Sequence, residues 1–231
     1  TDTFRSTWHE QGVSCIQCHS DQLSDPPADR TEFCGTLTIK QTLDNCATCH
    51  SRRGSYDDDF IPGDDYADHF HLQLPSQQGL YYADGQILEE VYVWTSFQMS
   101  RMGHSGVKCM DCHNPHSNAL ILPAENNALC MRCHQSPGLD GATVIEPLEH
   151  SFHAEGSTGN RCVECHMPHT TYMERDPRRD HGYLNPDPRL TIEMGIPNAC
   201  SRCHSGQDAE AGTYDLETMA AWPEERCGKD G

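Results

Sequence analysis

Six short stretches of the chain place two cysteines and a histidine at one fixed spacing, Cys-x-x-Cys-His. The clearest copy runs from Cys109 to His113 and continues to His116. Two thiols at this spacing can add to the vinyl groups of a porphyrin, and the histidine that follows can reach its iron from one face. The pattern is therefore the attachment signature of c-type haem. The six copies are Cys15, Cys18 and His19; Cys46, Cys49 and His50; Cys109, Cys112 and His113; Cys130, Cys133 and His134; Cys162, Cys165 and His166; and Cys200, Cys203 and His204.

The number of copies excludes chance. With 14 Cys and 15 His in 231 residues, random order would give about 0.05 copies of the motif. The rival interpretation is zinc, for which two Cys-x-x-Cys pairs would close one tetrahedral site. Zinc does not require a histidine after every second cysteine, yet all six copies have one. The sequence therefore predicts six haems c, each bound covalently.

The composition predicts how the chain folds around these cofactors. Six haems leave about 38 residues for each, so porphyrin must fill much of the interior. Apolar residues make up 35% of the chain, the mean hydropathy is −0.71, and 18 Gly and 14 Pro suit a loop-rich chain. We expect a mostly irregular fold with short α-helices, a multihaem cytochrome c wrapper around six covalently bound haems. Without haem it should not hold this fold.

We expect one hexahaem domain over residues 1–231, built from two lobes. Residues 1–83 form an N-terminal lobe with two haems, and residues 84–231 form a C-terminal lobe with a helix, four haems and a short tail. The apolar spacing of Ile87, Val91 and Trp94 predicts that helix over residues 86–102. A second short helix is expected from Leu216 to Trp222.

The N-terminal lobe also contains a haem-free acidic loop over residues 54–83. Five carboxylates surround Pro62 and Gly63, and oxygen ligands of this kind could hold calcium. Their spacing matches no EF-hand loop, so a solvated acidic loop is the alternative. The five are Asp57, Asp58, Asp59, Asp64 and Asp65.

The charge and hydropathy limit which partners and which compartment are possible. A net charge of −19 argues against binding to nucleic acid or to an anionic membrane surface. No apolar run is long enough to span a bilayer. Haem c is attached outside the cytoplasmic membrane, so we expect an exported protein, its signal removed, in the periplasm or at the cell exterior. Its expected partners are redox proteins or extracellular electron acceptors.

Two cysteines, Cys34 and Cys227, lie outside the motifs. In an oxidising compartment an intrachain disulfide between them is the interpretation we favour. Two free thiols and an intermolecular bridge are the alternatives, because sequence does not give connectivity.

Each iron needs a sixth ligand unless its haem is a catalytic site. Nine of the 15 histidines lie outside the motifs, which is more than six irons need. Ligation by two histidines at most or all irons is therefore expected, and it implies low reduction potentials. The expected sixth ligands are His9, His69, His116, His153, His169 and His181, with His150, His104 and His71 in reserve.

The neighbourhood of some of these histidines suggests how they act. His116 and His169 each lie three residues past a motif histidine, too close to reach the far face of their own haem, so we expect them to bind a neighbouring iron. His181 follows Asp180, whose carboxylate we expect to orient the imidazole. His69 also follows an aspartate.

Several runs of sequence carry a family resemblance. The chain is similar to the multihaem c-type cytochromes often fused to tetratricopeptide repeats, which belong with the nitrifiers' tetrahaem cytochrome, the pentahaem nitrite reductase and hydroxylamine oxidoreductase. The resemblance covers roughly residues 45–205 and implies a mostly irregular and helical wrapper around haems in alternating near-parallel and near-perpendicular pairs. It also implies ligand roles for His69, His116, His153 and His181. The runs are 84–93, 106–116, 162–168, 171–173, 176–181 and 197–200.

Two functions follow from the motifs. The first is electron transfer along six haems whose axial positions are filled. The second is reduction or oxidation of a small nitrogen or sulfur compound at one five-coordinate haem, although the Cys-x-x-Cys-Lys motif of the pentahaem nitrite reductase is not present.

Self-association is a further expectation. Residues 20–30 lack the histidine that relatives carry after the first motif. We therefore expect one iron to find its ligand elsewhere, with His9 donated across a head-to-tail contact of an extracellular filament. A monomeric or dimeric shuttle is the alternative.

Overall fold

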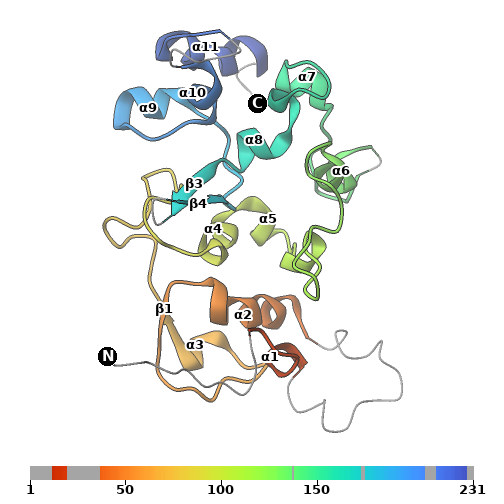
Figure 1. Ribbon diagram of the computed structural model, residues 1–231, viewed down its shortest axis with the longest axis vertical. Coiled ribbons are helices and arrows are strands. Elements are labelled where there is room, and N and C mark those ends of the chain that lie inside the picture. The colour runs from red at the N-terminus through yellow and green to blue at the C-terminus, as the bar shows by residue number, and fades with distance from the viewer. Residues whose placement is uncertain (1–11, 20–36, 137, 173–174, 206–211, 228–231) are drawn as a thin grey trace, which may run out of the picture. The chain divides into compact units, whose positions relative to one another are not determined.

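The computed structural model describes residues 12–19, 37–136, 138–172, 175–205 and 212–227 (Figure 1). The chain divides into two compact units, Thr1–Gln73 and Leu74–Gly231. The predicted lobe boundary, between residues 83 and 84, lies a little further along the chain. His9 and Cys34 are outside the described residues, as is the side chain of Cys227, so the disulfide and the donation of His9 across a head-to-tail contact stay predictions.

Within its described residues, the first unit contains three helices and one small sheet. Its elements are α1 (Ile16–His19), α2 (Ile39–His50), β1 (Arg53–Ser55), α3 (Tyr66–His69) and β2 (Phe70–Leu72). The longest of them, α2, begins with a capping box in which Thr38 and Gln41 each bond the other's backbone amide. The two strands pair antiparallel, with Gly54 opposite His71. The described part of this unit thus contains two motif-bearing helices, α1 and α2, and a two-stranded sheet whose strands are connected through α3.

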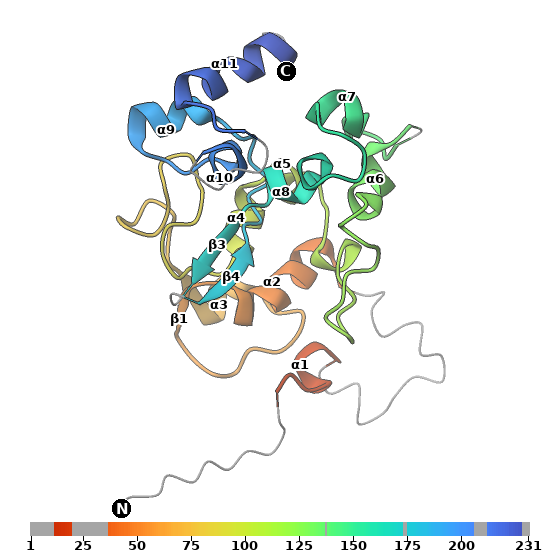
Figure 2. The same cartoon turned by 45° about the horizontal axis from the view of Figure 1, so that its top comes forward.

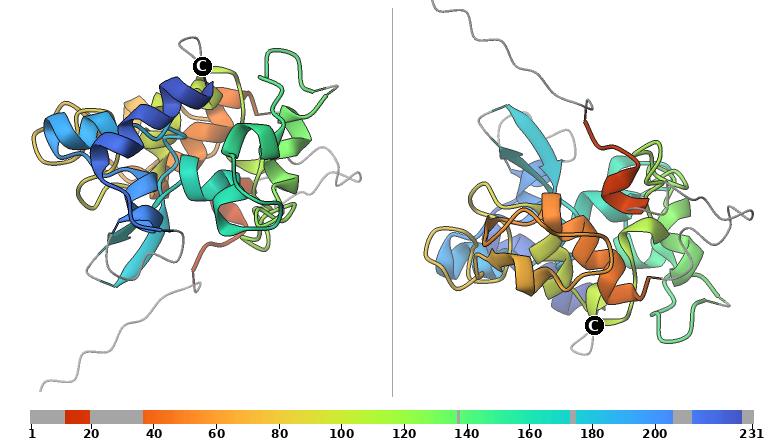
Figure 3. Two further views of the ribbon diagram at one scale, coloured as in Figure 1. Left: turned by 90° about the horizontal axis from the view of Figure 1, so that it is seen from above. Right: turned by 90° about the horizontal axis from the view of Figure 1, so that it is seen from below.

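The second unit is longer and equally irregular (Figures 1 and 2). Its elements are α4 (Val93–Met99), α5 (Arg101–His104), η3 (Cys109–Asp111), α6 (Ala128–His134), α7 (Pro147–Ser151), η4 (Thr158–Asn160), α8 (Cys162–His166), β3 (His169–Tyr172), β4 (Asp176–Arg179), α9 (Pro188–Met194), α10 (Ala199–His204) and α11 (Leu216–Cys227). Strands β3 and β4 pair antiparallel from His169 opposite Arg179 to Tyr172 opposite Asp176. At the end of the chain α11 packs against α9 (Figure 3).

The predicted helix over residues 86–102 is wrong in its first half. Residues before Val93 form a tight turn, in which Gln86 donates its backbone amide to the Asp84 carboxylate and Gly85 has φ +95°. A helix then runs only from Val93 to Met99, and Ser100 starts α5 as an N-cap. The apolar spacing that suggested a longer helix instead places Ile87 and Val91 in a small core with Leu80. The predicted C-terminal helix is present as α11.

Side chains supply little of the interior. Twelve hydrophobic residues are buried among the residues that the structure describes, and the connected core cluster contains Leu80, Ile87 and Val91 with Tyr81 packed against it. A unit of this size usually buries far more apolar side chain. Short helices with little sheet and so small a core agree with the fold class expected for a chain that wraps a large cofactor.

Candidate haem-binding site

Five of the six motifs end a helix, and in each the last helical residue is the motif histidine: α1, α2, α6, α8 and α10 end at His19, His50, His134, His166 and His204. On a helix, residues three and four apart lie on one face. The spacing therefore brings both thiols and the imidazole to the same side of one helical turn. The remaining motif makes a tighter turn at η3, where His113 donates its backbone amide to Cys109 at 2.9 Å. Four of the twelve motif cysteines are exposed and the other eight are partly exposed.

A buried amide pair joins the fourth and fifth motifs. Asn127 lies directly before α6, with φ +62°, and its Oδ1 accepts a hydrogen bond from the backbone amide of Cys162 at 2.9 Å. Its Nδ2 donates to the carbonyl of Asn160 at 2.8 Å. Asn160 in turn donates to Pro147 and to Ser151 on α7. Both asparagines are buried, so this network holds α6, α7 and α8 at fixed spacing.

The cysteines of consecutive motifs lie close together in the second unit. Burial first, and then the charges of Asp111 and Cys133, raise the pKa of Cys112. A hydrogen bond joins Cys130 and Cys162; it lowers the pKa of Cys162 to about 7 and raises that of Cys130.

The last two motifs are adjacent as well. Burial, followed by the neighbouring Cys200 and Cys203, raises the pKa of Cys165 to about 11, and α8 contacts α10. The attachment points of the four motifs in this unit therefore follow one another in sequence order.

Three motif histidines face a second histidine from elsewhere in the chain. Two imidazoles that share one metal, each with a bond of about 2 Å and about 1.2 Å more to its ring centre, have centres about 6.4 Å apart. The observed pairs are His113 with His181 at 6.3 Å, His150 with His166 at 6.0 Å, and His153 with His204 at 5.9 Å. These separations fit an iron between the two rings of each pair.

Hydrogen bonds to backbone carbonyls orient four imidazoles, three of which belong to the pairs above and one to the fourth motif. A carbonyl oxygen can only accept, so each ring must carry its proton on Nδ1, which leaves the Nε2 lone pair for a metal. The bonds run from His134 to Thr143 at 2.8 Å, from His153 to Ser151 at 2.6 Å, from His166 to Leu184 at 3.1 Å and from His181 to Arg179 at 3.0 Å. The donor set therefore fits haem iron.

Local backbone conformation separates the two histidines near α7. His150 lies on the helix, whereas Phe152, with φ +57°, ends it in the left-handed conformation. This reversal sends His153 in a different direction, towards His204, while His150 faces His166. Gly159 makes room for His153, because a Cβ at this position would lie 2.2 Å from His153 Cδ2.

The comparisons with known proteins concern the motifs and the fold. A family model for the doubled CXXCH motif matches residues 104–138, which contain the third and fourth motifs. The crystal structure of the outer cell wall cytochrome OcwA is similar to the chain, with a TM-score of 0.63 and 19% sequence identity. The chain has a multihaem cytochrome fold. The similarity covers 93% of this chain and 58% of OcwA, so the chain spans less than two thirds of that cytochrome's length. The sequence matches no curated protein.

The cytochrome motifs indicate covalently bound haem c, as the sequence predicted. The pairing of His150 with His166 differs from the expectation, because His150 is only a reserve ligand in the sequence analysis, whereas His153 is among the six expected ligands. The signal was present in the sequence, since His150 lies on a helix that begins with Pro147 and His153 follows it, but the separation of their directions depends on the Phe152 backbone.

The remaining predicted ligands of the cytochrome have other surroundings. His69 Nδ1 lies 2.7 Å from Asp57 and its Nε2 lies 3.3 Å from Asp64, and the hydrogen bond to Asp57 raises the pKa of His69. The partner of His69 is thus Asp57 and not the preceding aspartate. His71 packs on Gly54 and lies beside Tyr56. The other three, His104, His116 and His169, are exposed, and their ligand roles stay predictions.

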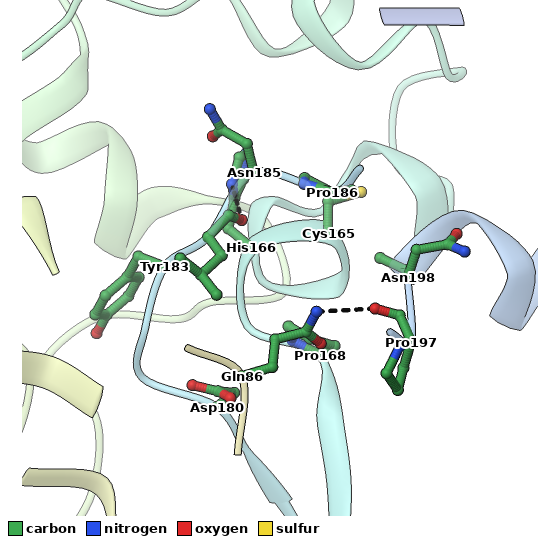
Figure 4. A pocket seen from close by; sticks show the side chains of 12 residues that line it. Gln86, Cys165, His166, Pro168, Asp180, Tyr183, Asn185, Pro186, Pro197 and Asn198 are labelled. Carbon is green, nitrogen blue, oxygen red and sulfur yellow. Dashed lines mark hydrogen bonds between the residues drawn. The ribbon is translucent and has the colours of Figure 1, made fainter. Parts of the chain in front are cut away.

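The Asp180 carboxylate does not orient His181 as expected. It is buried, and it accepts hydrogen bonds from the backbone amides of Ile87 at 2.9 Å and Gly182 at 2.7 Å. Burial raises the pKa of Asp180. Asp180 instead ties the residues after β4 to the segment before α4, and it lines a pocket with His166 and Gln86, which donates to the Pro197 carbonyl (Figure 4).

The acidic loop is engaged within its own unit. Asp65 caps α3 and pairs with Lys40 at 2.8 Å, while Asp57 and Asp64 face His69. Across the described residues, no group of three or more His, Cys, Asp or Glu side chains is arranged to hold a metal ion. Over the same residues no helix is long and apolar enough to cross a membrane.

Proposed function

We propose that the chain transfers electrons through six low-potential haems c, most of them ligated by two histidines. Each haem, when bound, supplies a one-electron couple between ferric and ferrous iron. The observation that carries the proposal is the hydrogen bond between Cys130 and Cys162 of the fourth and fifth motifs, together with the electrostatic interactions of Cys112 with Cys133 and of Cys165 with Cys200. Cofactors attached in this way would follow one another closely enough to pass electrons.

The three imidazole pairs support the axial ligands. We assign His181 to the haem of His113, His150 to that of His166, and His153 to that of His204, on ring separations of 6.3, 6.0 and 5.9 Å. For the haems of His19, His50 and His134 the proposed sixth ligands come from His9, His69, His116 and His169, on sequence alone. An iron with both axial positions filled binds no substrate, so the arrangement favours transfer over catalysis.

The test counts spin states. Electron paramagnetic resonance of the ferric protein, with the haem content determined chemically, should give six haems per chain and low-spin signals for most or all of them. A stoichiometric high-spin signal, together with rapid binding of cyanide or carbon monoxide, would favour the alternative of a reductase or oxidase with one five-coordinate haem. Fewer than six haems would contradict the proposal itself.

The compartment and partners form the finer part of the proposal. Covalent haem attachment and the likeness to an outer cell wall cytochrome support a place in the periplasm or outside the cell, with redox proteins or extracellular acceptors as partners. The family-like runs support kinship with the superfamily of the nitrifiers' tetrahaem cytochrome. Residues 20–30, which contain no histidine, support assembly into a head-to-tail filament through His9. Negative-stain microscopy and light scattering test this: uniform small particles at every concentration would exclude the filament.

A further inference from the structure

Two aromatic side chains from the C-terminal tail enclose the last motif histidine. The ring centre of His204 lies 5.2 Å from Trp222 and 5.6 Å from Tyr214, at interplanar angles of 80° and 66°. The two aromatic rings also meet each other edge-to-face at 5.2 Å. His204 therefore has an iron-facing side towards His153 and an aromatic side formed by Tyr214 and Trp222.

The aromatic pair is held in place by the fold. Helix α11, which carries Trp222, packs against α9, and its Met219 is completely buried. The backbone amide of Tyr214 donates to the His204 carbonyl at 2.8 Å. Trp222 is only partly exposed. The contact with His204 is thus a packed arrangement and not a chance approach of surface side chains.

His204 differs from two other motif histidines in the hydrogen bonding of its Nδ1 atom. His134 and His166 donate Nδ1–H to backbone carbonyls. His204 Nδ1 is buried and makes no hydrogen bond of full geometry with the described residues; burial lowers the pKa of His204, and a weaker backbone hydrogen bond to Gly212 opposes that shift. A carbonyl acceptor makes an imidazole more electron-rich and so stabilises ferric iron, and hydrogen bonding and burial around a ligand both tune the potential. An aromatic face is a much weaker acceptor.

We propose that Trp222 sets the reduction potential of the haem attached at Cys200 and Cys203, by packing against His204 and keeping water from its imidazole. Trp222 is a positioning residue that acts through His204. The inference rests on the proposed function, because it requires haem at this motif. The C-terminal tail, which carries no motif, then serves to raise the potential at one end of the haem series.

The experiment is a redox titration of the six-haem protein with dithionite. A Cys200→Ala/Cys203→Ala variant lacks the haem in question, so the component missing from its curve identifies that haem. Trp222→Ala should lower the equilibrium constant for reducing this haem about tenfold, or about 59 mV for one electron, because water can then reach the His204 imidazole and accept a hydrogen bond from it. Trp222→Phe should shift it less than threefold. Glu217→Ala, on the exposed side of α11, should change nothing.

Two further outcomes keep the proposal testable. If Trp222→Ala loses α11 in far-UV circular dichroism, Trp222→Gln retains the bulk and offers a carbonyl acceptor, and it should lower the same component. An unchanged component in a folded variant, or an equal shift of all six components, would overturn the proposal. A haem content below six in the parent protein would instead count against the proposed function.

Discussion

The side-chain amide of Asn127 donates to the backbone carbonyl of Asn160 at 2.8 Å, while its oxygen accepts from the amide of Cys162 at 2.9 Å. Asn127 is 5% exposed and Asn160 is 9% exposed, so removal of the Asn127 side chain leaves the Asn160 carbonyl with little access to water. Each buried polar group left unsatisfied costs about 1–3 kcal/mol. Asn127→Ala should therefore lower the free energy of unfolding by about 3 kcal/mol, measured by thermal unfolding of the haem-loaded protein.

The control for this variant is Gln135→Ala. Gln135 follows the same helix, α6, and is exposed, so its loss should change stability by less than about 0.5 kcal/mol. Equal effects of the two variants would show that the buried amide network contributes nothing specific.

His181→Ala should convert one haem from low spin to high spin without loss of covalent haem. The thioether bonds and His113 stay in place, and only the ring 6.3 Å from His113 is removed. Electron paramagnetic resonance and mass spectrometry of the same sample check both parts. His181→Met is the matched variant: it should remain low-spin and raise the potential of that haem, because thioether ligation favours the ferrous state. An unchanged spectrum in the alanine variant would remove His181 from the ligand set.

Gly159→Ala should disturb a haem whose attachment site lies more than forty residues away in sequence. The added Cβ would lie 2.2 Å from His153 Cδ2, so the His153 ring must move away from His204. We expect partial loss of low-spin signal at one haem. Thr158→Ala, an exposed neighbour on η4, should leave the spectrum as it is. If both variants behave alike, the glycine does not serve His153.

Arg179→Ala should remove the contacts that hold helix α8, which carries the fifth motif, and so lower the stability of the protein. The Arg179 guanidinium donates to the carbonyls of Val163 and Met167, at 3.0 Å each, and pairs with Glu164. These carbonyls lie in and directly after α8, where helical partners run out and positive charge is favourable. A loss of about 2 kcal/mol in unfolding free energy is expected.

The neighbouring arginine provides the control for that experiment. Arg178 pairs with Asp176 two residues away, and both side chains are well exposed, so Arg178→Ala should cost less than about 1 kcal/mol. Chemical denaturation followed by circular dichroism compares the two variants. A larger effect at Arg178 would contradict the role given to Arg179.

Removal of haem should abolish the fold. The buried side-chain cluster consists of Leu80, Ile87 and Val91 with Tyr81 beside it, which is too little apolar area to offset the chain entropy of a domain. Protein produced without haem attachment should show a far-UV spectrum of a largely unfolded chain and rapid hydrogen exchange. A compact, protected apoprotein would contradict the prediction.

The sequence by itself determined the cofactor, because the haem motif is local. Two cysteines three residues apart and a histidine one residue later lie on one face of any helical turn, as at α6, α8 and α10. No knowledge of distant contacts is needed to recognise such a site. The small apolar fraction likewise indicated an irregular wrapper, and the structure has short helices with little sheet.

Only the tertiary structure decided which distant residues meet. His181 is brought to His113 across 68 residues of chain (181 − 113), and nothing in the spacing of the sequence encodes that distance. The directions of His150 and His153 depend on the left-handed Phe152, a conformation that a bulky residue adopts only when its surroundings impose it. The apolar spacing before Val93 led to a wrong helix prediction because distant contacts decide the structure there too. The Asp84 turn and the contact of Ile87 with Asp180 outweighed the local helix preference.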